Sequence, residues 1–443
     1  MNTKLSNKLI STTLAFMMFL EVVLLGYAPV VSAKENTEPP KETSRQSDVI
    51  EKSEDYTVYE NEDGTRTIDM YTSDVRYKNE QGEYIDYDNS IVTMPTRRKR
   101  SVMDNYKYTN KEGMVDIKLP EDLASDVPIS IQDKDNNEVK FYPIFEKEVS
   151  KEETKGELKK ETVEGIYYEK EEKNTKIVYG SDDENIDMEY IPIDNGIKEN
   201  IIVNKPTDKN IFTYKIECSG MIPRIPEVGG VIFYDKDNPK EEVGAILTPY
   251  MTDSSENGGY SEDLKYSIEK SEEGTDTYIL TLTASKDYLE SKDRVYPVII
   301  DPTYTAKATN GVKDVYIESG YPTSNFYVST IRKMPIGYGS TDKICRTLIK
   351  FPELHAKIKG NYVTNANLKL YELSNGSPFS TLEVHKNTSS WALGEVTWNT
   401  RPKYTATVYA SKKLSNASSA HSLNITKLVQ EWAKGTQAIM VFF

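Results

Sequence analysis

The stretch Thr277-Tyr278-Ile279-Leu280-Thr281-Leu282-Thr283 places large apolar residues at alternate positions among threonines. Successive side chains of a β-strand point to opposite faces of its sheet, so Tyr278, Leu280 and Leu282 would share one buried face while the threonines face water. Threonine and aromatic residues are also common in strands. The stretch therefore predicts a half-buried β-strand.

Similar short runs recur along the chain and are separated by turn signals. Asp187-Met188-Glu189-Tyr190-Ile191 precedes the turn Asp194-Asn195-Gly196, and Glu62-Asp63-Gly64 and Glu80-Gln81-Gly82 each precede another run. Glycine-containing turns between such runs are typical of β-hairpins. With 443 residues, the chain is long enough for two or three domains of ordinary size. We expect an all-β fold with two or more β-sandwich-like domains.

The N-terminus has the layout of a secretory signal peptide. Lys4 and Lys8 precede an apolar stretch over 9–31, which ends in Val31-Ser32-Ala33. A retained membrane helix is the alternative, but Glu21 would be costly at bilayer depth. We therefore expect residues 1–33 to be removed, with no membrane span remaining, and the mature protein to be secreted.

Residues 34–54 contain Pro39-Pro40 among charged and polar residues, which predicts a disordered linker. The whole chain holds 70 acidic and 55 basic residues, a net charge of -15, so we expect no nucleic-acid partner. Only Cys218 and Cys345 occur, which excludes a disulfide framework. One long-range bridge between them stays open, although two buried thiols are the simpler interpretation.

Two segments are densely charged. Residues 146–173 are rich in Glu and Lys and would form a long charged hairpin or a short exposed helix. Arg97-Arg98-Lys99-Arg100 would be a solvated loop, a protease-sensitive site or a contact for an anionic wall polymer.

One short helix is expected near the C-terminus. Ile425, Leu428, Val429 and Trp432 follow helical spacing and would form one apolar stripe, and Gly435 would end the helix. Trp432 would then fill the core beneath the helix.

Residues 55–303 resemble the N-terminal β-region of wall-associated Rhs/YD-repeat proteins. The resemblance rests on Pro249-Tyr250-Met251-Thr252-Asp253-Ser254, Tyr296-Pro297-Val298-Ile299-Ile300-Asp301-Pro302, Asn195-Gly196-Ile197-Lys198-Glu199-Asn200 and the two early hairpins. No YD repeats or toxin module follow, so the chain would be the front end of a larger surface protein.

Residues 304–443 resemble a DNRLRE domain, a β-sandwich classed with carbohydrate-binding modules. The matching segments are Tyr321-Pro322-Thr323-Ser324-Asn325-Phe326, Arg346-Thr347-Leu348-Ile349-Lys350-Phe351, Ala366-Asn367-Leu368-Lys369-Leu370-Tyr371, Val396-Thr397-Trp398-Asn399-Thr400-Arg401-Pro402 and the expected helix. The resemblance implies a cell-wall-associated role in binding polysaccharide. Because eight residues follow Gly435, we expect this domain to be truncated.

Trp391 and Trp398 are the candidate ligand-binding residues, because exposed aromatic rings can stack on sugar faces. Tryptophan also supplies a large buried area, so filling the sandwich interior is the alternative for both.

No catalytic, cofactor-binding or metal-binding residues are identified. His355, His385 and His421 all lie in the C-terminal domain, and there is no His-Glu-x-x-His or Cys-x-x-Cys motif. Asp133-x-Asp135-x-Asn137 has oxygen ligands at alternate positions but lacks the glycine of an EF-hand, and predicts a hairpin turn. We therefore expect no enzyme and no cofactor.

Three functions remain open. The first is a cell-wall-associated structural or adhesion protein that binds polysaccharide through its C-terminal sandwich. The second is a ligand-free scaffold, the remnant of an Rhs/YD-repeat toxin. The third is a secreted glycan-active hydrolase, which needs only two carboxylates across a cleft.

Overall fold

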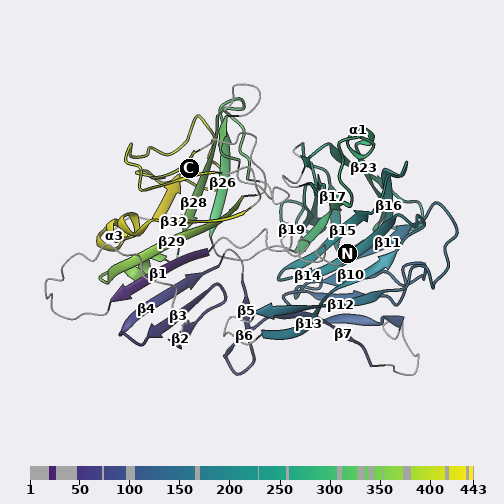
Figure 1. Cartoon of the computed structure of the whole chain (residues 1–443), viewed down its shortest axis with the longest axis horizontal. Coiled ribbons are helices and arrows are strands. Elements are labelled where there is room, and N and C mark those ends of the chain that lie inside the picture. Colours follow the sequence, from purple (N-terminus) through teal and green to yellow (C-terminus); the bar gives the residue numbers. More distant parts are fainter. Residues whose placement is uncertain are drawn as a thin grey trace, which may run out of the picture. The chain divides into compact units, whose positions relative to one another are not determined.

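The chain forms two compact units in the computed structural model (Figure 1). Unit 1 comprises Met1–Tyr84, Thr309–Tyr327 and Lys333–Phe443, and unit 2 comprises Ile85–Ala308 and Val328–Arg332. The structure describes residues 19–25, 47–71, 74–95, 105–164, 170–227, 229–255, 259–306, 312–327, 335–338, 344–352, 354–372, 381–414, 419–435 and 439–442.

Unit 2 contains two antiparallel sheets. The eight-stranded sheet has the order β22 (Leu264–Lys270), β23 (Thr277–Ala284), β16 (Ile211–Ser219), β11 (Glu138–Ile144), β10 (Ile129–Gln132), β9 (Asp116–Leu119), β8 (Tyr108–Glu112) and β7 (Asp88–Thr93). Neighbouring strands in this order pair antiparallel.

The second sheet of unit 2 is eleven-stranded. Its main path is β12 (Glu157–Glu164), β13 (Lys170–Gly180), β14 (Ile186–Ile193), β15 (Gly196–Val203), β25 (Thr303–Ala306), β19 (Glu242–Ile246), β18 (Val231–Asp235) and β17 (Met221–Arg224). Off this path lie β20 (Tyr250–Thr252), β21 (Tyr260–Ser261) and β24 (Val298–Asp301). The short helix α1 (Lys286–Leu289) follows β23.

The core of unit 2 lies between these two sheets, because residues of both contribute to one apolar cluster. Ile117 and Ile216 come from the eight-stranded sheet, and Ile201 and Phe233 come from the eleven-stranded sheet. The alternation that predicted β23 is confirmed at Leu280 and Leu282, which are buried. Tyr278 is half-buried and packs against the same cluster.

The charged segment 146–173 ends in a hairpin, as one of the two expected alternatives predicted. β12 pairs with β13 along its whole length, and β13 also contacts β7 of the other sheet. At this contact, the Asp88 carboxylate forms ion pairs with the Nζ atoms of Lys111, at 3.0 Å, and Lys173, at 3.1 Å. The hairpin therefore joins the two sheets at one edge of the sandwich.

Unit 1 also contains two larger sheets. One has the order β2 (Ser47–Lys52), β3 (Tyr56–Asn61), β4 (Thr65–Met70), β1 (Phe19–Leu25), β29 (Tyr362–Glu372) and β32 (Ser419–Asn424). The other has the order β26 (Lys313–Glu318), β28 (Ile344–Phe351), β33 (Ile439–Phe442), β30 (Thr381–Lys386) and β31 (Ala410–Lys413), with β27 (Gly337–Tyr338) beside β28. A separate pair is formed by β5 (Arg76–Lys78) and β6 (Tyr84–Asp86), and the boundary with unit 2 falls within β6, after Tyr84.

Two short helices, α2 (Leu354–Ile358) and α3 (Thr426–Lys434), complete the core of unit 1. Leu428, Val429 and Trp432 of α3 are buried, and Gly435 forms the C-cap. The expected C-terminal helix and its core-filling tryptophan are therefore confirmed, as is the all-β fold class with sandwich-like units. This core includes Ile68 of β4 and Leu368 of β29.

The structure differs from the expected boundaries at the N-terminal side. Ser47–Lys52 is strand β2, although the composition of 34–54 predicted a linker; residues 34–46 lie outside the described residues. β2 gains its stability by pairing with β3 rather than by burying its own side chains. Residues up to Tyr84 group with unit 1 rather than with the remainder of 55–303, because β4 pairs with β1 and β1 pairs with β29.

The expected signal peptide lies mostly outside the described residues. Of residues 1–33, the structure describes the backbone of β1, which pairs antiparallel with β4 and β29. No helix among the described residues is long and apolar enough to cross a membrane. The basic cluster Arg97-Arg98-Lys99-Arg100 also lies outside the described residues.

Several predicted turns are confirmed. β3 and β4 pair around Gly64, and β5 and β6 pair around Gly82; both glycines have positive φ, 76° and 83°, which favours glycine at these positions. Asp133 accepts hydrogen bonds from the backbone N–H groups of Asp135 and Asn137 within the β10–β11 turn.

The two cysteines are not joined by a disulfide. Cys218 is buried in unit 2, and its burial raises the pKa of its thiol, so the reactive thiolate is disfavoured. Cys345 is half-buried in β28 of unit 1.

Candidate functional site

Trp391 and Trp398 lie in the segment that follows β30 and covers one face of the β26–β28 pair. Val315 and Ile317 of β26 and Leu348 of β28 form a small apolar cluster on this face with Trp391 and Val396. Trp398 packs against the edge of the same cluster. The structure therefore brings both candidate residues to one surface of unit 1.

The two tryptophans have different environments. Trp391 is buried, with 8% of its surface exposed, and its indole Nε1 has no hydrogen-bond partner among the described residues. It therefore fills the small cluster, as the alternative interpretation had it. Trp398 is half-buried, and charged side chains surround its ring.

Cationic and aromatic side chains alternate next to Trp398. The guanidinium Cζ atoms of Arg401 and Arg346 lie 4.6 Å and 5.0 Å from the Trp398 ring centroid. The Arg346 Cζ atom is also 5.3 Å from the ring of Tyr404, whose centroid is 5.7 Å from that of His385. We call these five residues, Arg401, Trp398, Arg346, Tyr404 and His385, the arginine–aromatic row.

Strand register places Arg346 in this row. Arg346 pairs with Ile317 and Leu348 pairs with Val315, so these four side chains lie on the same face of the sheet. Arg346 therefore stands beside the small apolar cluster, where the Trp398 ring also packs.

Hydrogen bonds hold the rest of the row. The N–H of Thr388 donates to the Lys403 carbonyl and the N–H of Thr405 donates to the Lys386 carbonyl, which fixes Tyr404 beside β30. Nδ1 of His385 lies 3.2 Å from the Thr405 carbonyl oxygen. Arg401 donates to the carbonyl of Trp398.

A neighbouring loop supports the Trp398 segment. The side-chain amide of Asn325 donates to the carbonyls of Leu393 and Val396, at 2.8 and 2.6 Å. Tyr321 and Tyr327 of this loop are each 51% exposed. The motif 321–326 pointed to this loop, but nothing in the sequence showed that Asn325 anchors the tryptophan segment.

The row has a definite chemical character. Two guanidinium groups lie over the Trp398 ring, so this ring orients the arginines more than it offers an open stacking face. Arg401 is exposed and forms no ion pair among the described residues. Guanidinium N–H groups bind carboxylate and phosphate oxygens well, and the exposed ring of Tyr404 can contact a sugar.

The other histidines do not join this surface into a metal site. His355 lies in α2 and His421 lies in β32. Among the described residues, no group of three or more His, Cys, Asp or Glu side chains is arranged to hold a metal ion.

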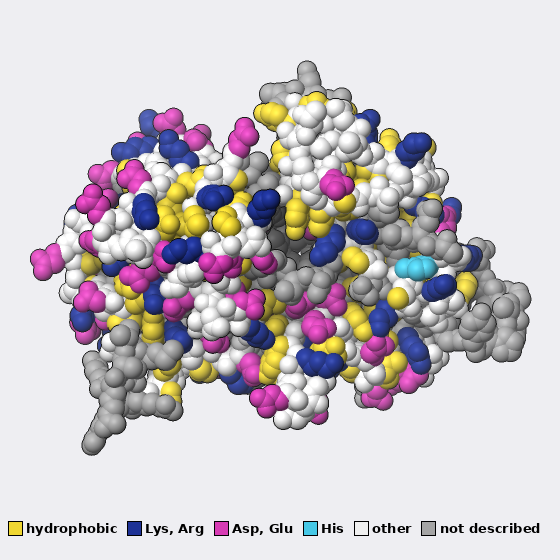
Figure 2. All heavy atoms as spheres, turned by 180° about the vertical axis from the view of Figure 1, so that it is seen from behind, with side chains coloured by type: hydrophobic (Ala, Val, Ile, Leu, Met, Phe, Trp, Pro, Cys, Tyr) yellow, Lys and Arg dark blue, Asp and Glu magenta, His cyan; other side chains and the backbone are white. Residues whose placement is uncertain are grey.

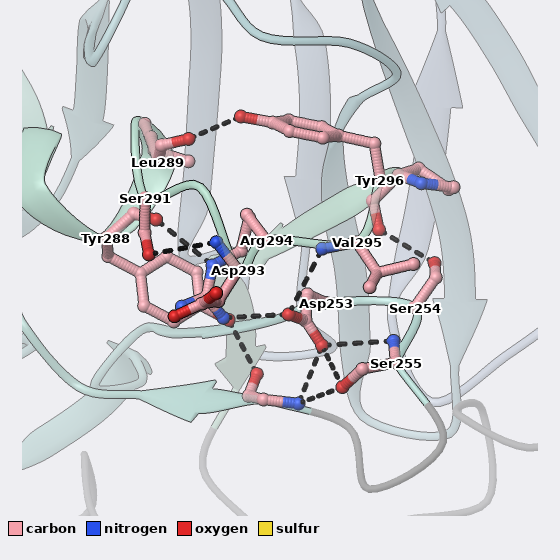
Figure 3. Close-up of polar contacts among 12 residues, drawn as sticks. Asp253, Ser254, Ser255, Tyr288, Leu289, Ser291, Asp293, Arg294, Val295 and Tyr296 are labelled. Carbon is pink, nitrogen blue, oxygen red and sulfur yellow. Dashed lines mark hydrogen bonds and ion pairs between the residues drawn. The ribbon is translucent and has the colours of Figure 1, made fainter.

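A second polar cluster, in unit 2, is built from the segments 249–254 and 296–302 and the loop between α1 and β24 (Figure 3). The Asp253 carboxylate accepts hydrogen bonds from the backbone N–H groups of Ser255 and Gly259, and pairs with Arg294 at 2.8 Å. The Arg294 guanidinium lies 3.7 Å from the Tyr288 ring centroid.

This cluster is a structural clasp. The Asp253 side chain is 2% exposed and that of Arg294 is 14% exposed, so little of the pair meets a ligand. Burial by itself would raise the pKa of Asp253, but the hydrogen bonds from Ser255, Gly259 and Val295 outweigh burial and lower it. The segments 249–254 and 296–302 therefore have a structural role, since their polar contacts are with other residues of unit 2.

The C-terminal region matches a known family. Residues 305–443 match carbohydrate-binding module family 96. The expected class, a β-sandwich classed with carbohydrate-binding modules, is thereby confirmed for this region, whereas the narrower DNRLRE identification stays a prediction.

Three curated relatives are similar to the chain. It is 30% identical over 283 residues, 59% of this chain, to the tRNA3(Ser)-specific nuclease WapA of Bacillus spizizenii and to the tRNA nuclease WapA of Bacillus subtilis strain 168. The tRNA(Glu)-specific nuclease WapA of Bacillus subtilis subsp. natto matches equally well. The match covers 11% of the length of each relative.

These relatives overturn one expectation. We expected no enzyme, but all three are named as tRNA nucleases, so the non-enzymatic class is contradicted. The same names conflict with the expectation of no nucleic-acid partner. The expectation rested on the absence of catalytic motifs, and such an absence carries no conclusion for a chain that matches about a tenth of each relative's length.

Proposed function

We propose that the protein is secreted, associates with the cell wall and binds polysaccharide through unit 1. The match of residues 305–443 to carbohydrate-binding module family 96 is the observation that carries this proposal. The arginine–aromatic row is the proposed contact surface, with Trp398 holding the two guanidinium groups and Tyr404 contacting sugar rings.

The row favours a polysaccharide with acidic groups. The chain carries a net charge of -15, and Figure 2 shows acidic and basic side chains interspersed over one face, without a broad basic area among the coloured residues. General charge attraction therefore does not favour an acidic ligand. Two guanidinium groups fixed beside aromatic rings provide a local site instead, where carboxylate or phosphate groups on the polymer accept N–H donors.

A binding assay with the full chain tests this proposal. We expect saturable binding to a polyuronate or a phosphate-bearing wall polymer, and at least tenfold weaker binding to a neutral glucan of similar length. Arg346→Ala should weaken the acidic interaction. Arg224→Ala is the matched control, because the Arg224 Cζ atom lies 5.0 Å from the Tyr234 ring in unit 2, whereas the row belongs to unit 1.

The outcomes distinguish the possibilities. Equal binding of neutral and acidic glycans, with no effect of Arg346→Ala, would reject the row as the contact surface. Absence of binding to every glycan would favour a ligand-free scaffold. Recovery of the protein only from the culture medium, and not from washed cell walls, would count against wall association.

The relatives suggest a second candidate activity, the cleavage of tRNA. Its support is the 283-residue match alone. Incubation of the purified chain with total tRNA, followed by gel analysis, tests it. Discrete fragments would assign the activity to these residues, and intact tRNA would assign it to the rest of the relatives' chains.

A further inference from the structure

A cavity of about 30 Å³ lies inside unit 2, between its two sheets. Its walls include Glu199 of β15, Tyr190 of β14 and Tyr304 of β25 from one sheet. Tyr214 of β16 and Phe141 of β11 come from the other sheet. The remaining lining is aliphatic apart from Tyr266. None of these lining residues belongs to the surface proposed for polysaccharide binding, which lies on unit 1.

Glu199 supplies the cavity's acidic group. Its Oε1 atom accepts a hydrogen bond from the Tyr190 hydroxyl at 2.6 Å and another from the Tyr214 hydroxyl at 2.9 Å. These two tyrosines belong to opposite sheets, so the carboxylate joins the two layers at the cavity. Glu199 itself is 9% exposed.

The described lining contains no Lys, Arg or His to neutralise this carboxylate. The nearby Lys198 ammonium group pairs with Asp301, at 2.9 Å. Burial raises the pKa of Glu199 to about 7, the hydrogen bonds from Tyr190 and Tyr214 oppose this rise, and the charge of Asp301 adds to it. A cation in the cavity would favour the ionised carboxylate.

Aromatic rings complete the environment. Phe141 packs edge-on against Tyr214 and Tyr304, with ring centroids 6.5 and 6.0 Å apart. Tyr304 is itself buried, with 5% of its surface exposed. Aromatic rings and a carboxylate together attract organic cations, through ring quadrupoles and direct charge.

The size of the cavity limits the ligand. A single water needs roughly 10–15 Å³ of such space, so about 30 Å³ accommodates a group of two or three non-hydrogen atoms. An ammonium group with one methyl substituent has this size. A neutral molecule of equal size would fit as well but would leave the carboxylate without a counter-charge.

We propose that the cavity of unit 2 binds a small organic ammonium group, with Glu199 as its counter-ion and the surrounding tyrosine rings as its walls. The ligand class is a primary or singly methylated amine, free or at the end of a larger molecule.

Thermal unfolding of the full chain with methylammonium chloride tests the proposal. We expect a saturable rise in the melting temperature, which sodium chloride at equal ionic strength and methanol at equal concentration do not reproduce. Glu199→Gln keeps a hydrogen-bond acceptor for both tyrosines and should abolish the rise. Glu217→Gln is the matched control, because Glu217 of β16 accepts a hydrogen bond from the Tyr142 hydroxyl of β11 but does not line the cavity.

A second measurement uses the unmodified protein, so the test does not depend on the folding of a variant. Between pH 8 and pH 5 the ionised fraction of a carboxyl with a pKa of about 7 falls about ninetyfold, so the apparent dissociation constant for methylammonium should rise by about that factor. Equal affinity at both pH values, an equal effect of sodium or methanol, or an unchanged response of Glu199→Gln would overturn the proposal.

Discussion

Arg294 of unit 2 and Arg401 of unit 1 both lie against an aromatic ring, yet their surroundings differ. The guanidinium of Arg294 contacts Tyr288 and pairs with the buried carboxylate of Asp253 (Figure 3). Arg401 contacts Trp398, is exposed, and has no carboxylate partner in the described part of the chain. The comparison teaches that the carboxylate partner, rather than the arginine–aromatic contact, separates a structural pair from a surface available to a ligand.

The largest expected effect separates the two tryptophans of unit 1. Trp391→Ala should lower the free energy of unfolding by about 4 kcal/mol, because it empties the small apolar cluster. Trp398→Ala should cost about 1 kcal/mol and mainly reduce glycan binding, since its ring is half-buried. Urea unfolding combined with a glycan-binding assay measures both, and equal losses of stability would contradict the distinction.

The next effect concerns the clasp of unit 2. Asp253→Ala should lower the free energy of unfolding by about 3 kcal/mol, because it leaves the Arg294 guanidinium without its carboxylate and orphans backbone N–H groups. Asp287→Ala in the exposed first turn of α1 is the control. A double-mutant cycle with Arg294→Ala should show strong coupling, and additive losses would argue against a paired clasp.

A pH effect of similar size is expected from Glu199. Its pKa is raised from 4.5 to about 7 in the folded protein, so the contribution of the protonated carboxyl is fully present below pH 4.5 and is lost as the pH rises through 7. The loss would reach up to about 3 kcal/mol. Urea unfolding from pH 4.5 to 8 measures it.

Glu199→Gln should flatten this pH dependence between pH 4.5 and 8. Other groups change stability in the acid range, and Asp253, whose pKa is lowered, contributes stability that is lost as the pH falls. If the free energy of unfolding of Glu199→Gln still falls as steeply with rising pH above pH 5 as that of the unmodified protein, another group causes the effect.

The smallest effect on stability is expected at Arg401. Arg401→Ala should change the free energy of unfolding by less than about 0.5 kcal/mol, because the side chain is exposed and unpaired among described residues. Its affinity for an acidic glycan should nevertheless fall about tenfold, which corresponds to about 1.4 kcal/mol of binding free energy. Calorimetric titration measures the binding free energy, and thermal unfolding measures the stability. A large loss of stability would show that Arg401, like Arg294, has a structural role.

Local patterns predicted much of the fold. Alternation gave the buried face of β23, turn residues marked the β3–β4 and β10–β11 hairpins, and helical spacing predicted α3 with its buried Trp432. They did not predict β2 in the expected linker, because an edge strand is stabilised by backbone pairing with a distant segment and needs few apolar side chains.

The sequence pointed to only part of the candidate site. Tryptophan in the segment 391–398 pointed to the surface that carries the arginine–aromatic row, since large aromatic residues are either core or contact residues. Nothing local distinguishes Trp391 from Trp398. Their difference depends on the distance of each ring from the β26–β28 pair and from Arg346 on β28.

The sequence by itself determined the fold class, most turns and the short helix, because strand alternation, helix periodicity and turn conformations depend on neighbouring residues. Only the tertiary structure decided which charged groups are paired. Asp253 and Arg294 are 41 residues apart, and Glu199 meets Tyr214 across two sheets. Burial and distance between such remote residues set both their ionisation and their availability to a ligand, and local sequence carries neither.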